Sequence, residues 1–248
     1  MKKLNLSRAV IQACLIFWAA LQIFPLYWLL TFSLKDNTEI FQGNMVGLPS
    51  VWRFENYTHA FMGGNVGRYL ANSIIVTAAT ILIVCIASLM ASYALIRMKW
   101  KLQKTFQLIF IMGITIPIHA ALLPVFIMMR QVHLINTYWC LIILYSAFAV
   151  PMAIMISSGF ISSIPVELEE AACIDGCNIY KIFIQIILPL MKPSLATIAI
   201  FTFLQSWNEL MFAVVFISKP AYRTLTVGIQ SLVGQYTTDW GPIGAGLV

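Results

Sequence analysis

Five long apolar segments constrain this chain more than any other feature of its sequence. Crossing the hydrocarbon core of a bilayer takes about 20 apolar residues in a helix, and five segments reach that length. Their approximate ranges are 10–33, 70–96, 105–129, 138–160 and 194–217. The chain is 60% hydrophobic and only 10% charged, whereas soluble domains are about 25% charged. The sequence therefore predicts an all-α membrane protein that forms one helical bundle.

Both ends of the chain have the character of membrane helices. The N-terminus begins with basic residues and then runs apolar from Ala9 to Leu34. That run is too long for the core of a signal peptide and has no convincing small-residue cleavage site, so we expect a retained first helix. The C-terminal sequence DWGPIGAGLV, residues 239–248, has the character of a sixth helix that is cut short.

The distribution of basic residues predicts how the spans are oriented. Lys and Arg concentrate in cytoplasmic loops, and short loops weigh most. With the N-terminus inside, the inside segments are 1–9, 97–104 and 161–193, and the main outside loops are 35–69 and 218–240. Six basic residues then lie outside and nine lie inside, namely Lys2, Lys3, Arg8, Arg97, Lys99, Lys101, Lys104, Lys181 and Lys192. The dense run RMKWKLQK decides the orientation, and we predict a cytoplasmic N-terminus.

Other function classes find little support in the sequence. The net charge of +6 lies at span ends and not on one basic face, which does not favour nucleic acid as a partner. Cys173 and Cys177 are four residues apart, but neither a second pair nor a nearby His completes a zinc site. No GxxxxGK[ST] phosphate-binding loop and no nucleophile motif occurs. We therefore expect no catalytic residue, no metal site and no cofactor bound by this chain.

The inside segment 161–193 needs an explanation, because loops between helices are usually short. Its central part, residues 164–189, reads IPVELEEAACIDGCNIYKIFIQIILP. Pro165 and the acidic residues after it suit the first turn of a helix, and Asp175-Gly176 supplies a turn. A second helix from about residue 178 has an apolar side that consists of Ile179, Ile182, Phe183 and Ile186. The sequence thus predicts a short helix–turn–helix, and its second helix is expected to end at Leu188-Pro189.

This helix–turn–helix has the properties of a docking element. Small side chains at Ala171 and Ala172 permit close approach by a partner, and the apolar second helix can anchor the loop against its own bundle. The alternative is an amphipathic helix that lies on the bilayer surface. Anionic lipid headgroups would repel the acidic first helix, which argues against that alternative.

The run EEAACIDG, followed by Phe183, Ile186 and Leu188-Pro189, resembles the EAA signature of permeases in binding-protein-dependent ABC importers. Cys177 stands where that family often has Ala, which is a change between small residues. In the family the first helix of the loop, called the coupling helix, sits in a cleft of a cytoplasmic ATPase subunit. The resemblance implies that ATPase docking involves Glu169, Glu170, Ala171, Ala172, Asp175 and Gly176.

The resemblance extends along nearly the whole chain and points to the carbohydrate branch. The most branch-specific stretch, residues 203–241, reads FLQSWNELMFAVVFISKPAYRTLTVGIQSLVGQYTTDWG. The chain is similar to the second permease of maltose-, multiple-sugar- and glycerol phosphate-type importers. This implies a type I ABC importer transmembrane domain at 69–248, which contains the coupling (EAA) loop at 164–189. A first transmembrane helix and an extracytoplasmic loop at 1–68 precede it.

The same resemblance implies a set of partners. They are a second homologous permease, two ATPase subunits that use ATP, and an extracytoplasmic sugar-binding protein. The implied location is the cell (inner) membrane of a bacterium or archaeon, crossed several times. The implied function is formation of the translocation path for sugar uptake, driven by the separate ATPase through the coupling loop.

A polar group within the last predicted span is a candidate for the substrate path. Glu209 is the only acidic residue within a predicted span, and a charge at that depth costs about 2.5–3.5 kcal/mol on insertion scales, so it should face the bundle interior. With Trp207 and Asn208 it combines hydrogen-bonding groups and a flat ring, as sugar sites do. The alternative is that these three residues lock the helix against its neighbours or form a gate.

Prolines and a histidine mark the spans before it. Pro117, Pro124 and Pro151 interrupt the third and fourth spans, and kinks at proline are tolerated where neighbouring helices satisfy the freed backbone groups. The simplest interpretation of these kinks is packing. His119, beside Pro117, is interpreted as a packed or pore-lining residue and not as a ligand.

Two other classes of membrane protein remain as alternatives. An ion-coupled secondary transporter would need charged residues in several spans, and only Glu209 qualifies. An intramembrane enzyme would need paired catalytic groups at membrane depth, and none is visible in the sequence. An importer permease accounts for the spans, the inside loop and the last span together.

Overall fold

The structure is a computed structural model and describes residues 6–233 and 238–248. Across these ranges every regular element is a helix, which confirms the predicted all-α class. Lys2 and Lys3, which contribute to the predicted topology, and residues 234–237 of the carbohydrate-type stretch lie outside the described residues. The chain divides into two compact units, one formed by residues 1–68 and 227–248 and the other by residues 69–226.

The first unit is built around α1 (Leu6–Ser33), a long apolar helix with Pro25 inside it. The most apolar stretch of α1 buries none of its residues within this chain, as suits a helix that lipid or other subunits surround. The short helices α2 (Asn37–Gln42), α3 (Glu55–Thr58) and η1 (His59–Gly63) follow it.

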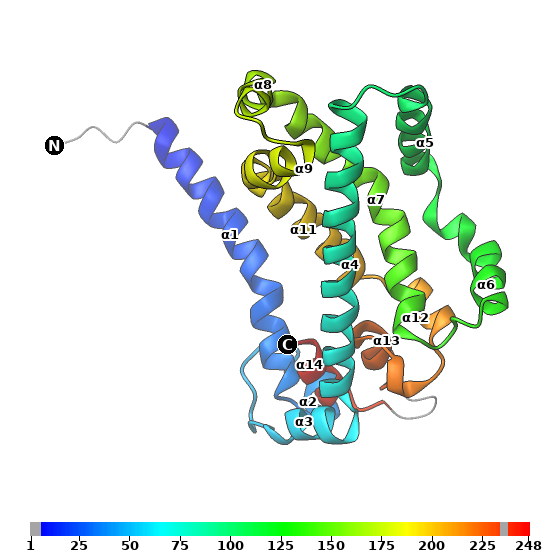
Figure 1. Ribbon diagram of the computed structural model, residues 1–248. Coiled ribbons are helices and arrows are strands. Elements are labelled where there is room, and N and C mark those ends of the chain that lie inside the picture. Colours follow the sequence, from blue (N-terminus) through cyan, green and yellow to red (C-terminus); the bar gives the residue numbers. More distant parts are fainter. Residues whose placement is uncertain (1–5, 234–237) are drawn as a thin grey trace. The chain divides into compact units, whose positions relative to one another are not determined.

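The last helix of the chain packs on α1. A helix does begin where the sixth span was predicted, namely α14 (Trp240–Leu247), and it contacts the C-terminal end of α1 (Figure 1). Gly244 permits this close approach, because a Cβ atom there would lie only 2.6 Å from the ring of Phe32.

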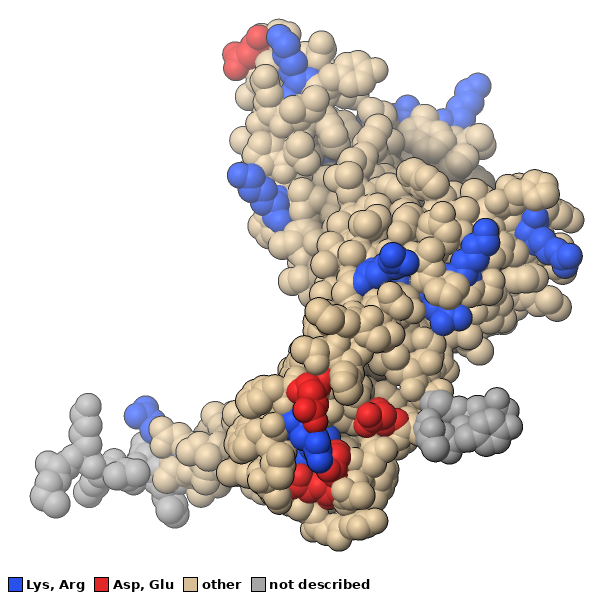
Figure 2. All heavy atoms as spheres, turned by 90° about the horizontal axis from the view of Figure 1, so that it is seen from below, with Lys and Arg blue, Asp and Glu red and all other residues tan. Residues whose placement is uncertain are grey.

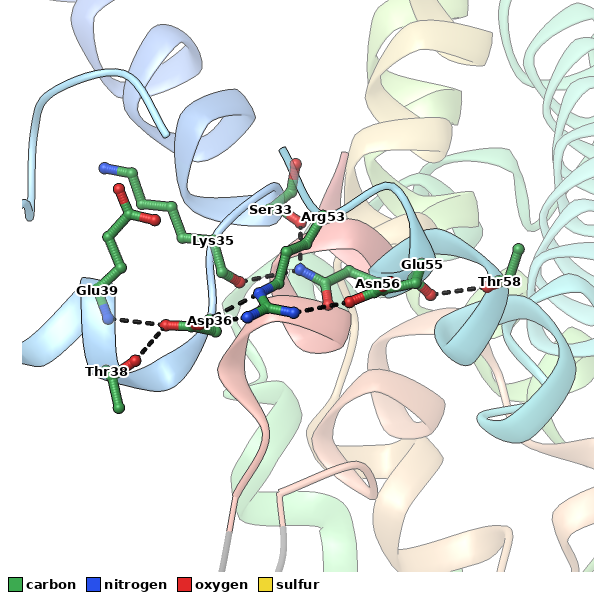
Figure 3. Close-up of polar contacts among 9 residues, drawn as sticks. All are labelled: Ser33, Lys35, Asp36, Thr38, Glu39, Arg53, Glu55, Asn56 and Thr58. Atoms are coloured by element: carbon green, nitrogen blue, oxygen red, sulfur yellow. Dashed lines mark hydrogen bonds and ion pairs between the residues drawn. The ribbon is translucent and has the colours of Figure 1, made fainter. Parts of the chain in front are cut away.

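A network of ion pairs and hydrogen bonds folds the segment after α1 (Figure 3). Asp36 caps α2, since its Oδ1 accepts hydrogen bonds from the Glu39 N–H at 2.8 Å and from the Thr38 hydroxyl at 2.6 Å. Arg53 joins this cap to the start of α3, because it pairs with Asp36 at 2.8 Å and with Glu55 at 2.9 Å. We call Asp36, Thr38, Glu39, Arg53 and Glu55 the loop polar cluster.

Lys35 is fully buried beside the loop polar cluster. Its ammonium donates hydrogen bonds to the backbone carbonyls of Asn44 at 2.6 Å and Gly47 at 2.7 Å. Burial lowers the pKa of Lys35, although Glu39 opposes that shift. The backbone of Lys35 is held in turn by the Asn56 amide, which donates to its carbonyl at 2.9 Å. The loop therefore has a definite fold.

The second unit contains the remaining helices. In chain order they are α4 (Val66–Ile96, residues 69–96 in this unit), α5 (Gln103–Thr115), η2 (Ile118–Ala121), α6 (Leu122–Gln131), α7 (Tyr138–Ser163), α8 (Glu167–Ile174), α9 (Ile179–Ile182), η3 (Phe183–Ile187), α10 (Leu188–Leu190), α11 (Lys192–Trp207), α12 (Met211–Phe216) and η4 (Pro220–Tyr222). The boundary between the units falls within α13 (Leu225–Gln230).

Two small residues of α7 bring the central helices of this unit together. Val84 of α4, Ala149 and Ala153 of α7, and Ile198 of α11 form one buried cluster. Small side chains let helices approach closely in a membrane, where packing and not the hydrophobic effect drives association. The space-filling view of the chain shows a mostly uncharged surface, with the charged side chains in small groups (Figure 2).

Three of the five predicted spans are confirmed as single helices long and apolar enough to cross a membrane, namely α1 from Arg8, α4 and α7. The third predicted span is interrupted, because the helix stops at Thr115 and its continuation is bent by 95°. Ile116 adopts an extended conformation, as a residue before proline prefers, so Pro117 ends the helix where only a kink was expected. Counting each bent helix pair as one span gives up to five spans among the described residues.

The fifth predicted span, 194–217, is also discontinuous. α11 begins at Lys192 and ends at Trp207, and α12 begins at Met211. Residues 179–190 and α11 are together long and apolar enough to form one span, but the two parts are bent by 70° relative to each other. The three residues between α11 and α12 include Glu209.

Candidate docking loop and membrane-depth cavity

The first helix of the predicted docking loop is α8, and local chemistry explains both of its ends. Glu167, Glu169 and Glu170 occupy its first turn, where carboxylates interact favourably with the positive end of the helix dipole. The helix begins at Glu167, two residues after Pro165. Gly176 ends it with a φ of +78°, a left-handed conformation that glycine adopts at little cost. The predicted turn at Asp175-Gly176 is confirmed.

The second helix of the loop anchors it to the second unit. Asn178 caps α9 by accepting a hydrogen bond from the Lys181 N–H at 3.0 Å. A π-helical turn follows at η3, which brings Ile187 to a fully buried position, while Ile179 of the predicted apolar side stays exposed. The predicted end at Leu188-Pro189 is wrong, because both residues lie in α10 and the helical run continues to Leu190. Pro189, which lacks an N–H, stands near the start of that short helix, and the run bends at Met191.

The residues implied in ATPase docking have two different environments. Glu170, Ala171, Asp175 and Gly176 are exposed on the outer side of α8. Ala172 is buried in the apolar cluster beneath the helix. Glu169 is mostly buried as well, because it faces α4. The structure thus brings four of the six to one accessible surface, and the other two hold α8 in place.

Two exposed apolar side chains extend the accessible surface of the loop. Ile174, in the last turn of α8, is 87% exposed, and Tyr180 in α9 is 76% exposed. Helical periodicity does not identify these two residues, because it finds apolar residues that face inward. Ile174 does not fit that helical period and precedes the Asp175-Gly176 turn. An apolar residue at such a position was the only indication in the sequence that its side chain is exposed.

Glu169 makes the polar contacts that fix α8 against the bundle. Its Oε1 lies 2.7 Å from Nε of Arg97, and its Oε2 accepts a hydrogen bond from the Tyr93 hydroxyl at 3.0 Å. In the sequence Arg97 counts only as one of the charges that set topology. Tyr93 and Arg97 stand four residues apart, which places them on the same side of a helix, and that spacing was the only local hint.

A cavity of about 470 Å³ opens within the second unit. Its lining mixes hydrogen-bonding side chains with aromatic rings, which is the usual composition of a small-molecule site. The lining residues that matter here are Thr80, His119, Tyr145, Phe148, Gln205, Asn208, Glu209 and Phe212. His119 is therefore a lining residue, and its ring lies 6.0 Å from that of Phe212.

Of the three residues proposed for the substrate path, two line this cavity. Asn208 is exposed, and its amide donates to the Leu204 carbonyl at 2.8 Å. Trp207 is not among the lining residues and stacks on Phe203, with ring centroids 5.2 Å apart.

Glu209 lines the cavity while its carboxylate is used by the protein itself. It accepts hydrogen bonds from the Tyr145 hydroxyl at 2.8 Å and from the N–H groups of Phe212 at 2.9 Å and Ala213 at 3.1 Å. It therefore caps α12 and ties that helix to α7. This is the locking arrangement that the sequence left open as an alternative to sugar contact.

Known proteins are similar to this chain in sequence and in fold. Residues 83–248 match the family described as "Binding-protein-dependent transport system inner membrane component". The chain is 37% identical over 224 residues to the probable ABC transporter permease protein YurM of Bacillus subtilis, covering 90% of this chain and 74% of the relative. It is 34% identical over 242 residues to the diacetylchitobiose uptake system permease protein NgcG of Streptomyces coelicolor, covering 97% and 80%.

The fold also matches a solved structure. A crystal structure of a bacterial ABC transporter involved in the import of the acidic polysaccharide alginate superposes with a TM-score of 0.85 at 21% identity, covering 100% of this chain and 92% of that one. The family match spans most of the chain, and the relatives are permeases, not enzymes. This chain belongs to the family of binding-protein-dependent transport system inner membrane components and is a permease of the ABC importer type.

Proposed function

We propose that this chain and a second permease of the same family together form the membrane path for carbohydrate uptake. The chain is a permease by family, and such importers work with an ATPase and a substrate-binding protein. A carbohydrate is the substrate class because the relative from Streptomyces coelicolor takes up diacetylchitobiose. The mixed polar and aromatic lining of the cavity supports the same class, since sugars offer hydroxyl groups and flat apolar faces.

The observation that carries this proposal is the accessible surface of α8. Exposed carboxylates at Glu170 and Asp175 stand beside a small residue, Ala171, and beside the apolar side chains of Ile174 and Tyr180. Apolar contacts surrounded by charges are typical of a protein interface. The occupant is an ATPase subunit, two of which use ATP in the assembled importer. Displacement of α8 by the ATPase then opens and closes the path in alternation.

The proposed orientation follows from the basic residues. The N-terminus, residues 97–104 and residues 161–193 lie on the cytoplasmic side, and residues 35–69 lie outside. The ATPase then meets α8 from the cytoplasm, and the binding protein delivers sugar from the other side. The location is the inner membrane of a bacterium or archaeon, which the chain crosses several times.

Within the cavity we infer different tasks for the neighbouring residues. Asn208 is exposed at the cavity wall and is the proposed sugar contact. Glu209 holds the wall, because three donors of this chain already occupy its carboxylate. Trp207, which stacks on Phe203, supports α11 behind the wall.

Co-purification with the ATPase tests this function. Glu170→Arg reverses a charge on the accessible surface of α8, and Glu55→Arg makes the same change in the loop proposed to lie outside. We expect the wild-type chain and Glu55→Arg to retain the ATPase from detergent and Glu170→Arg to lose it, while all three insert equally into the membrane. Equal retention by both variants contradicts the docking surface, and absence of an ATPase from every sample contradicts the proposed function.

A further inference from the structure

Arg97 joins three helices at one point of the second unit. It directly follows α4, whose last residue is Ile96, and its guanidinium pairs with Glu169 in the first turn of α8 at 2.7 Å. Its Nη2 also donates to the backbone carbonyls of Ile161 at 2.9 Å and Ile164 at 2.5 Å, where α7 ends. Figure 1 shows α8 at the end of the unit where α4 ends and α5 begins. One side chain thus links α4, α7 and α8.

The ion pair is shielded from water. The side chains of Arg97 and Glu169 are each 12% exposed, so solvent screens their attraction far less than it screens a surface pair. Removing one partner would leave the other charge buried without compensation, which is strongly unfavourable. The Tyr93 hydroxyl, one helical turn before Arg97, donates to the second carboxylate oxygen. Arg97 Nε and Glu169 Oε1 form a close ion pair that lacks hydrogen-bond geometry, so the directional contact to Glu169 is the hydrogen bond from Tyr93.

Apolar packing surrounds this contact but does not replace it. Leu89, Tyr93 and Ile161 form a buried cluster with Ala172 of α8 and with residues of the second loop helix. Apolar packing stabilises many slightly shifted arrangements to a similar degree, because it is non-directional. The hydrogen bonds from Tyr93 to Glu169 and from Arg97 to the Ile161 and Ile164 carbonyls depend on the direction of approach as well as on distance, so they resist such shifts. The polar contacts of Arg97 and Tyr93 therefore tie α8 to the end of α4.

We propose that Arg97 is a positioning residue that transmits the displacement of α8 to α4 and α7, with Glu169 as its partner on the moving helix. This inference rests on the proposed function, because it assumes that an ATPase displaces α8. It assigns Glu169 to transmission and leaves the exposed surface of α8 for ATPase contact. Loss of the pair should then leave ATPase binding intact while it weakens the ATP-dependent opening of the cavity.

The test uses the complex purified with its ATPase and measures two quantities. The first is the amount of ATPase that co-purifies. The second is the labelling rate of a thiol placed in the cavity by Gln205→Cys, with a membrane-impermeant methanethiosulfonate reagent, in the absence and presence of ATP with vanadate. Arg97→Gln and Glu169→Gln break the pair, and Arg97→Glu with Glu169→Arg restores it in reverse. Arg130→Gln, an exposed arginine in the last turn of α6, is the matched control.

We expect the control to behave as wild type. Arg97→Gln and Glu169→Gln should keep the ATPase, while the ATP-dependent change in labelling rate falls about tenfold, which corresponds to about 1.4 kcal/mol. The reversed pair should recover part of that change. An unaltered labelling response in both single variants overturns the inference and leaves the proposed function intact.

Two further outcomes separate the alternatives. If the single variants lose the ATPase and the labelling response in proportion, and the reversed pair recovers neither, the pair only stabilises the loop and the transmission role is wrong. If the wild-type complex shows no labelling change with ATP, the proposed function fails and the transmission role fails with it.

Discussion

At the residue scale, the role of Glu209 follows from the hydrogen bonds that its carboxylate accepts. Glu209 lies between α11 and α12, and its two carboxylate oxygens receive three hydrogen bonds from this chain. One of these comes from Tyr145, which is buried in α7. Hydrogen bonds to a charged acceptor contribute about 1.5–3 kcal/mol each. Glu209 therefore fixes the helix break that shapes the cavity wall.

This role makes Glu209 and Tyr145 interdependent. We predict that Tyr145→Phe and Glu209→Gln each lower the unfolding free energy of the permease by about 1–3 kcal/mol and lower transport to a similar extent. The double variant should be no worse than the more severe single variant, because both changes remove the same contact. Thermal unfolding in detergent and sugar uptake by vesicles measure these effects. A direct sugar contact would instead lower sugar affinity in Glu209→Gln alone, with Asn208→Ala as the comparison.

Asp36 gives the loop polar cluster a pH dependence. The Thr38 hydroxyl, the Glu39 N–H and Arg53 together lower the pKa of Asp36 to about 2. An unfolded aspartate titrates near pH 3.9, so the stability that ionised Asp36 contributes is complete above about pH 4 and is lost as the pH falls towards about 2. We predict that the hydrogen-exchange protection of residues 37–42 decreases in that window.

Two variants check the assignment to Asp36. Asp36→Asn retains a helix cap of similar quality, and it should remove the pH dependence of protection in residues 37–42. Thr38→Val deletes the first of the contacts that lower the pKa, and it should move the midpoint to higher pH. An unchanged midpoint in Thr38→Val would show that another group controls the transition.

At the element scale, short-range chemistry could be predicted and long-range packing could not. The turn at Asp175-Gly176 and the two helices of the docking loop follow from local preferences, and the structure contains them. The break at Pro117 was expected only as a kink, because the size of a bend depends on what packs around it. The Tyr93–Glu169 contact joins residues 76 positions apart, and no local pattern links such positions.

Close contact between α5 and α7 depends on one glycine. A Cβ atom at Gly113 would lie 2.9 Å from Cγ of Pro151, and the proline ring cannot rotate away. We predict that Gly113→Ala separates the two helices and lowers the unfolding free energy by about 1–3 kcal/mol, as overpacking does. Gly159→Ala is the control, since nothing lies within 4 Å of a Cβ atom there. Thermal unfolding in detergent measures the stability of both variants. Equal stabilities would contradict the close approach of α5 and α7 at Gly113.

At the scale of the whole molecule, the helical class of the elements was predictable from the sequence, whereas the breaks in the third and fifth predicted spans were not. Apolar segments indicated an all-α membrane bundle, since segment length and composition alone decide whether a helix can span a bilayer. The assignment of 69–248 to one transmembrane domain stays a prediction, and the compact units of the structure are residues 1–68 with 227–248 and residues 69–226. That grouping arises from contacts such as the one between Gly244 and Phe32, which depend on the folded chain.

The orientation of the whole chain in the membrane provides the last prediction. Lys101→Cys and Ser50→Cys place a thiol at exposed positions of the 97–104 and 35–69 segments. With a cytoplasmic N-terminus, an impermeant maleimide should label Lys101→Cys only in inverted vesicles and Ser50→Cys only in right-side-out vesicles. The wild-type chain, with its own five cysteines, sets the background. The opposite pattern would place α8 outside, away from any cytoplasmic ATPase, and labelling of both positions from one side would contradict a membrane-spanning segment between them.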